Sequence, residues 1–184
     1  MQNDDALYDE YLSGSAQAFD ALVIRYGDSL TVFLYGYLHN WQDAEDMMVE
    51  AFARIMSKKP LIRAGRFKAY LFKTARNLAA RFHSTDSGEK RFSLDGLEDV
   101  FPDLETPEEL IQNQERSHIL HLCLERIEPE LREALWLVYF DGMQYKEAAV
   151  VMKVTARRIE RLLTRGKAAL RTELEKEGIT NAYE

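Results

Sequence analysis

The sequence predicts an all-α protein of two small helical domains joined by an acidic linker, the C-terminal domain being a helix-turn-helix. Apolar residues recur at three- and four-residue steps through almost the whole chain, which is the helical period. Capping residues and prolines divide this pattern into short helices. A hydrophobic content of 46% is ample for packed cores. We place the domains at 1–85 and 106–184, with the linker at 86–105.

Three helices are expected in the N-terminal domain. Ser15 is a plausible N-cap for the first, and Asn40 caps the second, whose first turn carries acidic side chains that suit the positive end of the helix dipole. The second helix should end just before Pro60, because the residue before a proline disfavours helical geometry. A short basic loop at 61–65 then leads to a third helix at about 66–83.

The C-terminal domain begins with the clearest helix start in the chain. Thr106–Glu109 combines an N-cap, a proline at the first helical position and a capping-box glutamate. Glu128-Pro129 starts a further helix, which Asp141-Gly142 ends. Two more helices are expected, at 145–152 and at 156 to about 177. No strand pattern competes with this interpretation.

Positive charge is concentrated in two blocks, although the net charge is −7. Residues 51–83 contain nine Lys or Arg and no acid, and residues 144–171 contain eight against two acids. Residues 86–115, which lie between the blocks, carry ten carboxylates and two cations. This segregation indicates two polyanion-binding surfaces joined by an acidic connector.

The second basic block has the length and breaks of a helix-turn-helix. Residues 153–155 make the turn, and Thr155 caps the second helix. One face of that helix is basic, whereas Ile159, Leu162 and Leu163 lie on the opposite, apolar side. A helix fits the major groove, where arginine binds guanine edges or phosphates. A solvated basic face on an ordinary bundle is the alternative. The basic face and its cap comprise Thr155, Arg157, Arg158, Arg161 and Arg165.

The helix at 66–83 in the first block has two different faces. An apolar stripe, expected in the core, comprises Phe67, Leu71, Ala75, Leu78 and Phe82. A second stripe mixes an aromatic ring, an amide and two cations: Tyr70, Lys73, Asn77 and Arg81. This mixture suits single-stranded nucleic acid, because bases stack on aromatic rings while cations follow the backbone. Ordinary packing of the tyrosine is the alternative.

Three segments of the chain resemble extracytoplasmic-function (ECF, group IV) sigma factors of bacterial RNA polymerase. DAEDMMVEAF at 43–52 is similar to the family's D-A-E-D-hydrophobic-x-Q-E-x-F segment, and FKAYLFKTARNLA at 67–79 resembles its F-x-x-W-L-x-x-I-A-x-N-x-A segment. Several residues also match the pattern of the family's second domain, namely Glu147, Ala149, Thr155, Ile159, Leu162, Arg165 and Leu170. The chain departs from the family at Tyr70 (usually Trp), Val49 (usually Gln) and Lys153 (often Gly), and Gly166 interrupts the last helix.

The resemblance implies a role for each segment. Core polymerase would be bound by the helix carrying Asp43, Glu45, Asp46, Met48, Val49 and Glu50. The melted −10 element would be captured by Lys58, Lys59, Arg63, Arg66, Tyr70, Lys73, Asn77 and Arg81. The duplex −35 element would be bound by Thr155, Arg157, Arg158, Arg161 and Arg165. The linker would thread into the polymerase channels, and an anti-sigma factor is a possible further partner.

Other functional classes receive less support from the sequence. A single cysteine, Cys123, excludes an intramolecular disulfide, and we expect a cytoplasmic protein with no secretory signal or membrane helix. No phosphate loop or catalytic triad is present, so we expect no enzyme and no cofactor. His118, His121 and Cys123 lack a second ligand pair at useful spacing, so we expect no metal site. The alternatives are a helix-turn-helix regulator with a partner-binding N-terminal domain, and a protein-interaction module that binds no DNA.

Overall fold

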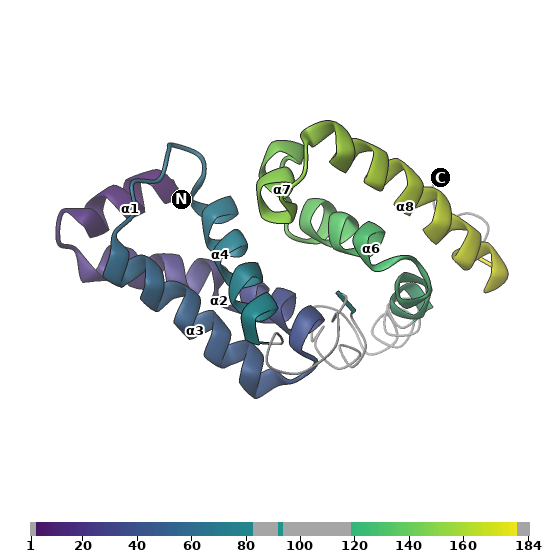
Figure 1. Ribbon diagram of the computed structural model, residues 1–184, viewed down its shortest axis with the longest axis horizontal. Helices are drawn as coiled ribbons and strands as arrows, with labels where there is room; N and C mark the ends of the chain where they lie inside the picture. The colour runs from purple at the N-terminus through teal and green to yellow at the C-terminus, as the bar shows by residue number, and fades with distance from the viewer. Residues whose placement is uncertain (1–2, 83–91, 94–118, 180–184) are drawn as a thin grey trace, which may run out of the picture.

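The computed structural model describes residues 3–82, 92–93 and 119–179, and every regular element in these ranges is helical (Figure 1). The N-terminal half, residues 3–82, contains α1 (Asp4–Leu12), α2 (Ala16–Leu38), α3 (Trp41–Lys58) and α4 (Phe67–Phe82). In the C-terminal half, residues 119–179, a helical stretch at 119–126 precedes α6 (Pro129–Leu135), the π-helical turn η2 (Trp136–Phe140), α7 (Tyr145–Met152) and α8 (Ala156–Lys176).

Local capping sets most of the helix boundaries, as the sequence predicts. The Ser15 hydroxyl accepts a hydrogen bond from the backbone N–H of Ala18, and the Asn40 side chain accepts one from that of Asp43. Helix α3 ends because Lys59 adopts a left-handed conformation with φ of 41°. The expected starts of α2, α3, α6, α7 and α8 are confirmed.

The N-terminal half packs around α2, which contacts α1, α3 and α4. Helix α1 was not predicted from the sequence, yet it buries Leu7, Tyr8 and Tyr11 against this core. Phe82 departs from the predicted apolar stripe, because it lies at the last turn of α4 and remains 42% exposed. Residue 83, which was expected to end this helix, lies outside the described residues.

In the C-terminal half, α8 packs on both α6 and α7. The π-helical turn widens the end of α6, and Asp141 closes it by donating its N–H to the carbonyl of Trp136 at 3.1 Å. Gly142 follows with φ of 63°, so the predicted stop at Asp141-Gly142 is confirmed. The start predicted at Thr106 lies outside the described residues.

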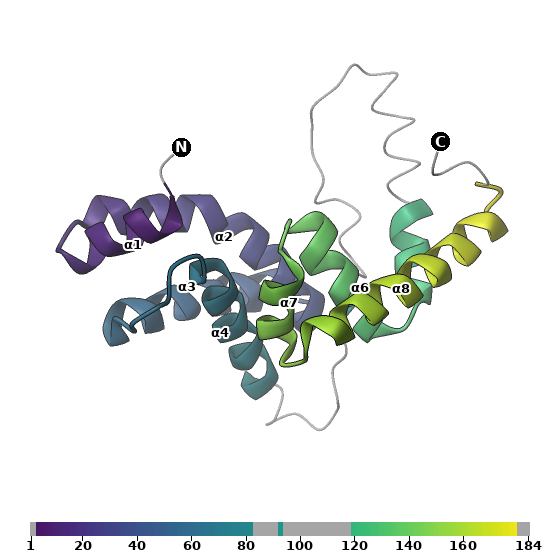
Figure 2. The ribbon, with the colours of Figure 1, turned by 90° about the horizontal axis from the view of Figure 1, so that it is seen from above.

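The two halves share one buried apolar cluster, because α7 packs directly on α4 (Figures 1 and 2). The Arg76 guanidinium of α4 pairs with the Glu133 carboxylate of α6 at 2.7 Å, and the Lys68 ammonium donates to the carbonyl of Asp141. Phe92 lies between Phe33 of α2 and Trp136 of η2. The described part of the chain therefore folds as one packed unit.

Asp141 makes the free energy of unfolding depend on pH. Its carboxyl is 8% exposed, and burial raises its pKa to about 7 against the opposing positive charge of Lys68. A raised carboxyl pKa gives stability that is complete below the unfolded pKa near 4 and is lost as the pH rises through 7.

We expect Asp141→Asn to be more stable than the wild type at pH 8, because the amide carries no charge to bury. Its advantage in unfolding free energy should grow by about 2–3 kcal/mol between pH 5 and pH 8, measured by urea denaturation. Asp20→Asn at an exposed site of α2 serves as the control. An advantage that does not change with pH would contradict the assignment.

Candidate nucleic-acid interfaces

Helix α1 holds the basic loop that follows α3. The Tyr8 hydroxyl donates to the carbonyl of Pro60 at 2.8 Å, and the Asp5 carboxylate accepts the N–H of Gly65 at 2.7 Å. Burial raises the pKa of Tyr8 to about 12, so its hydroxyl stays protonated and able to donate. The loop is thereby fixed at both ends while Leu61, at 97% exposure, projects into solvent.

A basic hollow of about 160 Å³ lies between α3 and α4. Four of the predicted −10 residues line it, together with Arg54, Ile55 and Thr74, which were not predicted as site residues. The four are Lys58, Tyr70, Asn77 and Arg81. Tyr70 is half-buried, and Thr74 donates to its carbonyl at 2.8 Å. Cations, an amide and an aromatic ring therefore surround one small space, the combination that binds an unstacked base and its phosphate.

The remaining predicted −10 residues lie outside the lining of this hollow. Lys59 and Arg63 are exposed on the basic loop, where the Lys59 ammonium lies over the Tyr11 ring at 5.2 Å. Arg66 and Lys73 are half-buried, at the start and on the second turn of α4. The predicted −10 residues thus divide among the basic hollow, the loop beside it, and the start and second turn of α4.

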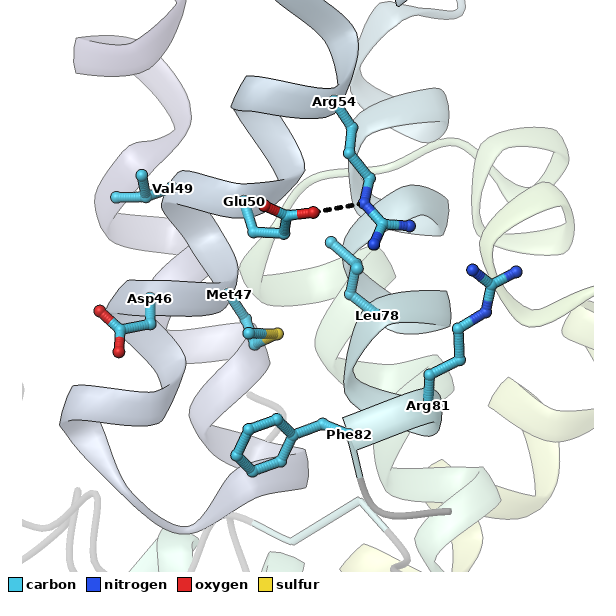
Figure 3. A pocket seen from close by; sticks show the side chains of 8 residues that line it. All are labelled: Asp46, Met47, Val49, Glu50, Arg54, Leu78, Arg81 and Phe82. Atoms are coloured by element: carbon cyan, nitrogen blue, oxygen red, sulfur yellow. Dashed lines mark hydrogen bonds and ion pairs between the residues drawn. The ribbon is translucent and has the colours of Figure 1, made fainter. Parts of the chain in front are cut away.

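An open groove of about 540 Å³ continues along α3 and α4 from the basic hollow (Figure 3). Asp46, Val49 and Glu50 of the predicted polymerase-binding set line it from α3, and Val49 is 58% exposed. Phe82 and Arg81 line it from α4. An apolar strip with charged edges is typical of a surface that binds another protein.

The other predicted polymerase-binding residues lie on the same helix but not in the groove. Asp43 and Met48 are half-buried, whereas Glu45 is exposed. Arg54 lines both the groove and the basic hollow, and its guanidinium pairs with the Glu50 carboxylate at 2.6 Å. The groove and the basic hollow are therefore neighbouring parts of one surface.

Helices α7 and α8 have helix-turn-helix connectivity, and local interactions fix the turn. Lys153 occupies it in a left-handed conformation with φ of 58°, a backbone conformation that favours glycine. The Thr155 hydroxyl accepts the N–H of Arg158 at 3.2 Å, as predicted for the cap. Gly166 lies where α8 approaches α6, since a β-carbon there would stand 3.1 Å from a methyl of Leu135. The glycine does not break the helix.

All four predicted arginines of α8 are exposed, and two of them make ion pairs with glutamates. Arg158 contacts the Glu130 carboxylate at 2.8 Å, and Arg165 contacts Glu128 at 3.1 Å. Arg157 and Arg161 make no ion pair with any described carboxylate. Exposed ion pairs contribute about 0–1 kcal/mol, so Glu128 and Glu130 can be exchanged for phosphates at small cost.

Two cations of the first basic block, Lys68 and Arg76, were not assigned to a site from the sequence. They lie on a third face of α4, and both contact residues of the C-terminal half. Their eight-residue spacing was visible in the sequence, but their partners are distant residues that periodicity cannot reveal.

The described residues contain no group of three His, Cys, Asp or Glu side chains placed to hold a metal ion. His121 and Cys123 are buried, and His118 lies outside the described residues. Within the same ranges, no helix is long and apolar enough to cross a membrane.

Comparisons with known proteins match both halves of the chain. The Sigma-70 region 2 family model matches residues 22–87 and the Sigma-70 region 4 model matches residues 117–170, together more than half of the chain. The chain belongs to the sigma-70 family. It is an ECF sigma factor of RNA polymerase, and it directs transcription initiation.

Curated relatives of this sigma factor span nearly its whole length. RNA polymerase sigma-H factor of Pseudomonas aeruginosa is 26% identical over 92% of this chain and 93% of its own. The ECF RNA polymerase sigma-E factor of Escherichia coli is 24% identical over 91% and 92%. The solved structure of CnrH in complex with the cytosolic domain of CnrY is similar in fold, with a TM-score of 0.65, 20% identity and coverage of 94% and 97%.

We expect Tyr8→Phe to loosen the basic loop, because it removes the hydrogen bond to Pro60. Unfolding free energy should fall by about 1 kcal/mol, and amide hydrogen exchange should accelerate at 59–66. Tyr139→Phe, at an exposed hydroxyl in η2, is the matched control and should change neither. Unchanged exchange in the loop of Tyr8→Phe would show that α1 does not hold it.

Proposed function

We propose that this sigma factor divides promoter recognition between its two halves. The basic hollow and loop of the N-terminal half bind the melted −10 strand, and α8 binds the −35 duplex. The observation that carries this proposal is the enclosure of Tyr70 and Asn77 by Arg54, Lys58 and Arg81. A duplex keeps its bases stacked and has little use for such a hollow, whereas an unstacked base requires one.

The groove on α3 and α4 is the proposed contact with core RNA polymerase. Val49 and Phe82 supply its exposed apolar surface, and Asp46 and Glu50 supply charge on the α3 side. Its position beside the basic hollow would place the melted strand next to the polymerase. In this proposal the protein acts only by binding, with no catalytic group of its own, and does so in the cytoplasm.

We also propose that the chain belongs to group IV, which the segments at 43–52 and 67–79 support. The two family matches support a division into domains, which we place at 1–85 and 106–184 with a linker at 86–105. CnrH is bound to the cytosolic domain of CnrY, which supports an anti-sigma factor as a further partner here.

The direct test is promoter-dependent transcription with purified core polymerase. We expect specific transcripts from a cognate-promoter fragment only when this protein is added. Failure to bind core and to support initiation on every candidate promoter would refute the polymerase and promoter assignments. Duplex binding without core, together with that failure, would favour the helix-turn-helix regulator.

The two nucleic-acid surfaces should respond differently to substitution. Tyr70→Ala and Asn77→Ala should impair promoter opening, measured by permanganate reactivity, while duplex affinity persists. Tyr70→Phe keeps the stacking ring and should preserve opening. Arg161→Ala should lower duplex affinity by about 1–3 kcal/mol, whereas Arg171→Ala, farther along α8, should have a smaller effect. Equal losses of duplex binding in both sets would contradict the division.

A further inference from the structure

We propose that Glu128 and Glu130, at the start of α6, compete with DNA phosphates for two arginines of α8. They hold Arg165 and Arg158 in ion pairs and thereby lower the affinity of α8 for duplex DNA, whatever its sequence. This role rests on the duplex binding proposed above for α8.

The four exposed arginines of α8 form two stripes on the helix surface. Arg157 and Arg161 lie four residues apart and share one stripe, whereas Arg158 and Arg165 lie seven residues apart and share another. The second stripe lies beside the start of α6, because its two arginines contact the glutamates there. Among the described residues, therefore, one stripe has carboxylate partners and the other has none.

The ion pairs occupy the nitrogen atoms that a phosphate would need. Nη2 of Arg158 lies 2.8 Å and 2.9 Å from the two carboxylate oxygens of Glu130, and its Nε lies 3.2 Å from one of them. Nη2 of Arg165 lies 3.1 Å and 3.2 Å from the two oxygens of Glu128. Arginine binds phosphate through the same fork of N–H groups. Each arginine must therefore leave its glutamate before those groups can bind a phosphate.

Both pairs are open to water, so phosphate can reach them. Side-chain exposure is 48% for Arg158 and 41% for Glu130, and it is 60% for Arg165 and 63% for Glu128. An exposed ion pair contributes little free energy, which corresponds to a factor of about one to five in affinity. After the exchange the released carboxylate stays close to the phosphate and repels it. The glutamates therefore weaken duplex binding without preventing it.

Neither carboxylate is needed to start α6. Glu128 occupies the N-cap of that helix, but its side chain makes no capping hydrogen bond. Its backbone carbonyl instead accepts the N–H groups of Leu131 and Arg132, both at 3.0 Å. Pro129 then begins the helix. Glutamine at residue 128 or 130 keeps these contacts, so the charge can be removed without removing the helix start.

Weaker phosphate contacts suit a protein that must find few sites among many. Duplex DNA that lacks the target sequence is bound almost entirely through its phosphates. The two glutamates weaken that binding on every sequence, whereas base contacts by Arg157 and Arg161 have no such competitor among the described residues. The free protein is thereby held less on non-target DNA, which offers very many competing sites.

Glu130→Gln in the full-length protein tests this competition, with Glu175→Gln as the matched control. Glu175 pairs with Arg171 near the end of α8 at similar exposure, so its loss changes the net charge equally. Affinity for a fluorescein-labelled mixed-sequence duplex, at about 50 mM salt, should rise about threefold for Glu130→Gln and about tenfold with Glu128→Gln added. The control should change affinity less than about 1.5-fold, and all gains should shrink as the salt concentration rises.

A double-mutant cycle separates competition for an arginine from general repulsion of DNA. The gain from Glu130→Gln should fall to the value of the control in an Arg158→Ala background, because no arginine is left to release. It should remain in an Arg161→Ala background.

A gain that persists without Arg158 would overturn the proposed competition, as would wild-type duplex binding that neither glutamine tightens beyond the control. Absence of duplex binding by every variant would overturn it together with the proposed role of α8. Core-dependent transcription, measured in parallel, tests the proposed function separately, because the mixed-sequence duplex carries no promoter.

Discussion

Helix α4 is constrained to serve three surfaces at once, and the rest of the structure is arranged around it. Phe67, Leu71 and Ala75 close the core of the N-terminal half. Tyr70, Asn77 and Arg81, on a second face, form one wall of the basic hollow. Lys68 and Arg76, on the third face, contact the C-terminal half. With sixteen residues, α4 leaves little of its surface unassigned.

Glutamates of the C-terminal half form ion pairs with arginines of both basic blocks. Glu133, whose side chain is buried, holds the half-buried Arg76, whereas Glu128 and Glu130 hold Arg165 and Arg158 in exposed pairs. Loss of one partner from a buried pair costs about 3–5 kcal/mol, but an exposed pair contributes about 0–1 kcal/mol. Arg158 and Arg165 of α8 can therefore exchange carboxylate for phosphate readily, whereas Arg76 cannot do so without losing its contact with the C-terminal half.

Local features were predictable from the sequence, because they depend on neighbours along the chain. The caps at Ser15, Asn40 and Thr155 and the stop at Asp141-Gly142 all lie where their side chains indicate. The hollow was predictable in part, since Tyr70, Asn77 and Arg81 share one helical face; Arg54 was missed because it comes from a different helix.

Features that depend on distant partners were not predictable in this way. Helix α1 is short, and its stability comes from burying Tyr8 and Tyr11 in the tertiary core. The fit of Phe92 against Gly36 joins residues far apart in sequence, so no periodicity reveals it. Phe82 has the spacing of the predicted apolar stripe, but it lies in the last turn of α4 and its ring is exposed in the groove.

In this structure Arg76 and Glu133 bind each other across the two halves of the protein. A double-mutant cycle of Arg76→Ala and Glu133→Ala, read out as free energy of unfolding, measures that contact directly. We expect a coupling of about 2–3 kcal/mol that persists at high salt, because the Glu133 carboxylate is only 5% exposed. Additive effects, with coupling below about 0.5 kcal/mol, would show that the halves are not held together by this pair.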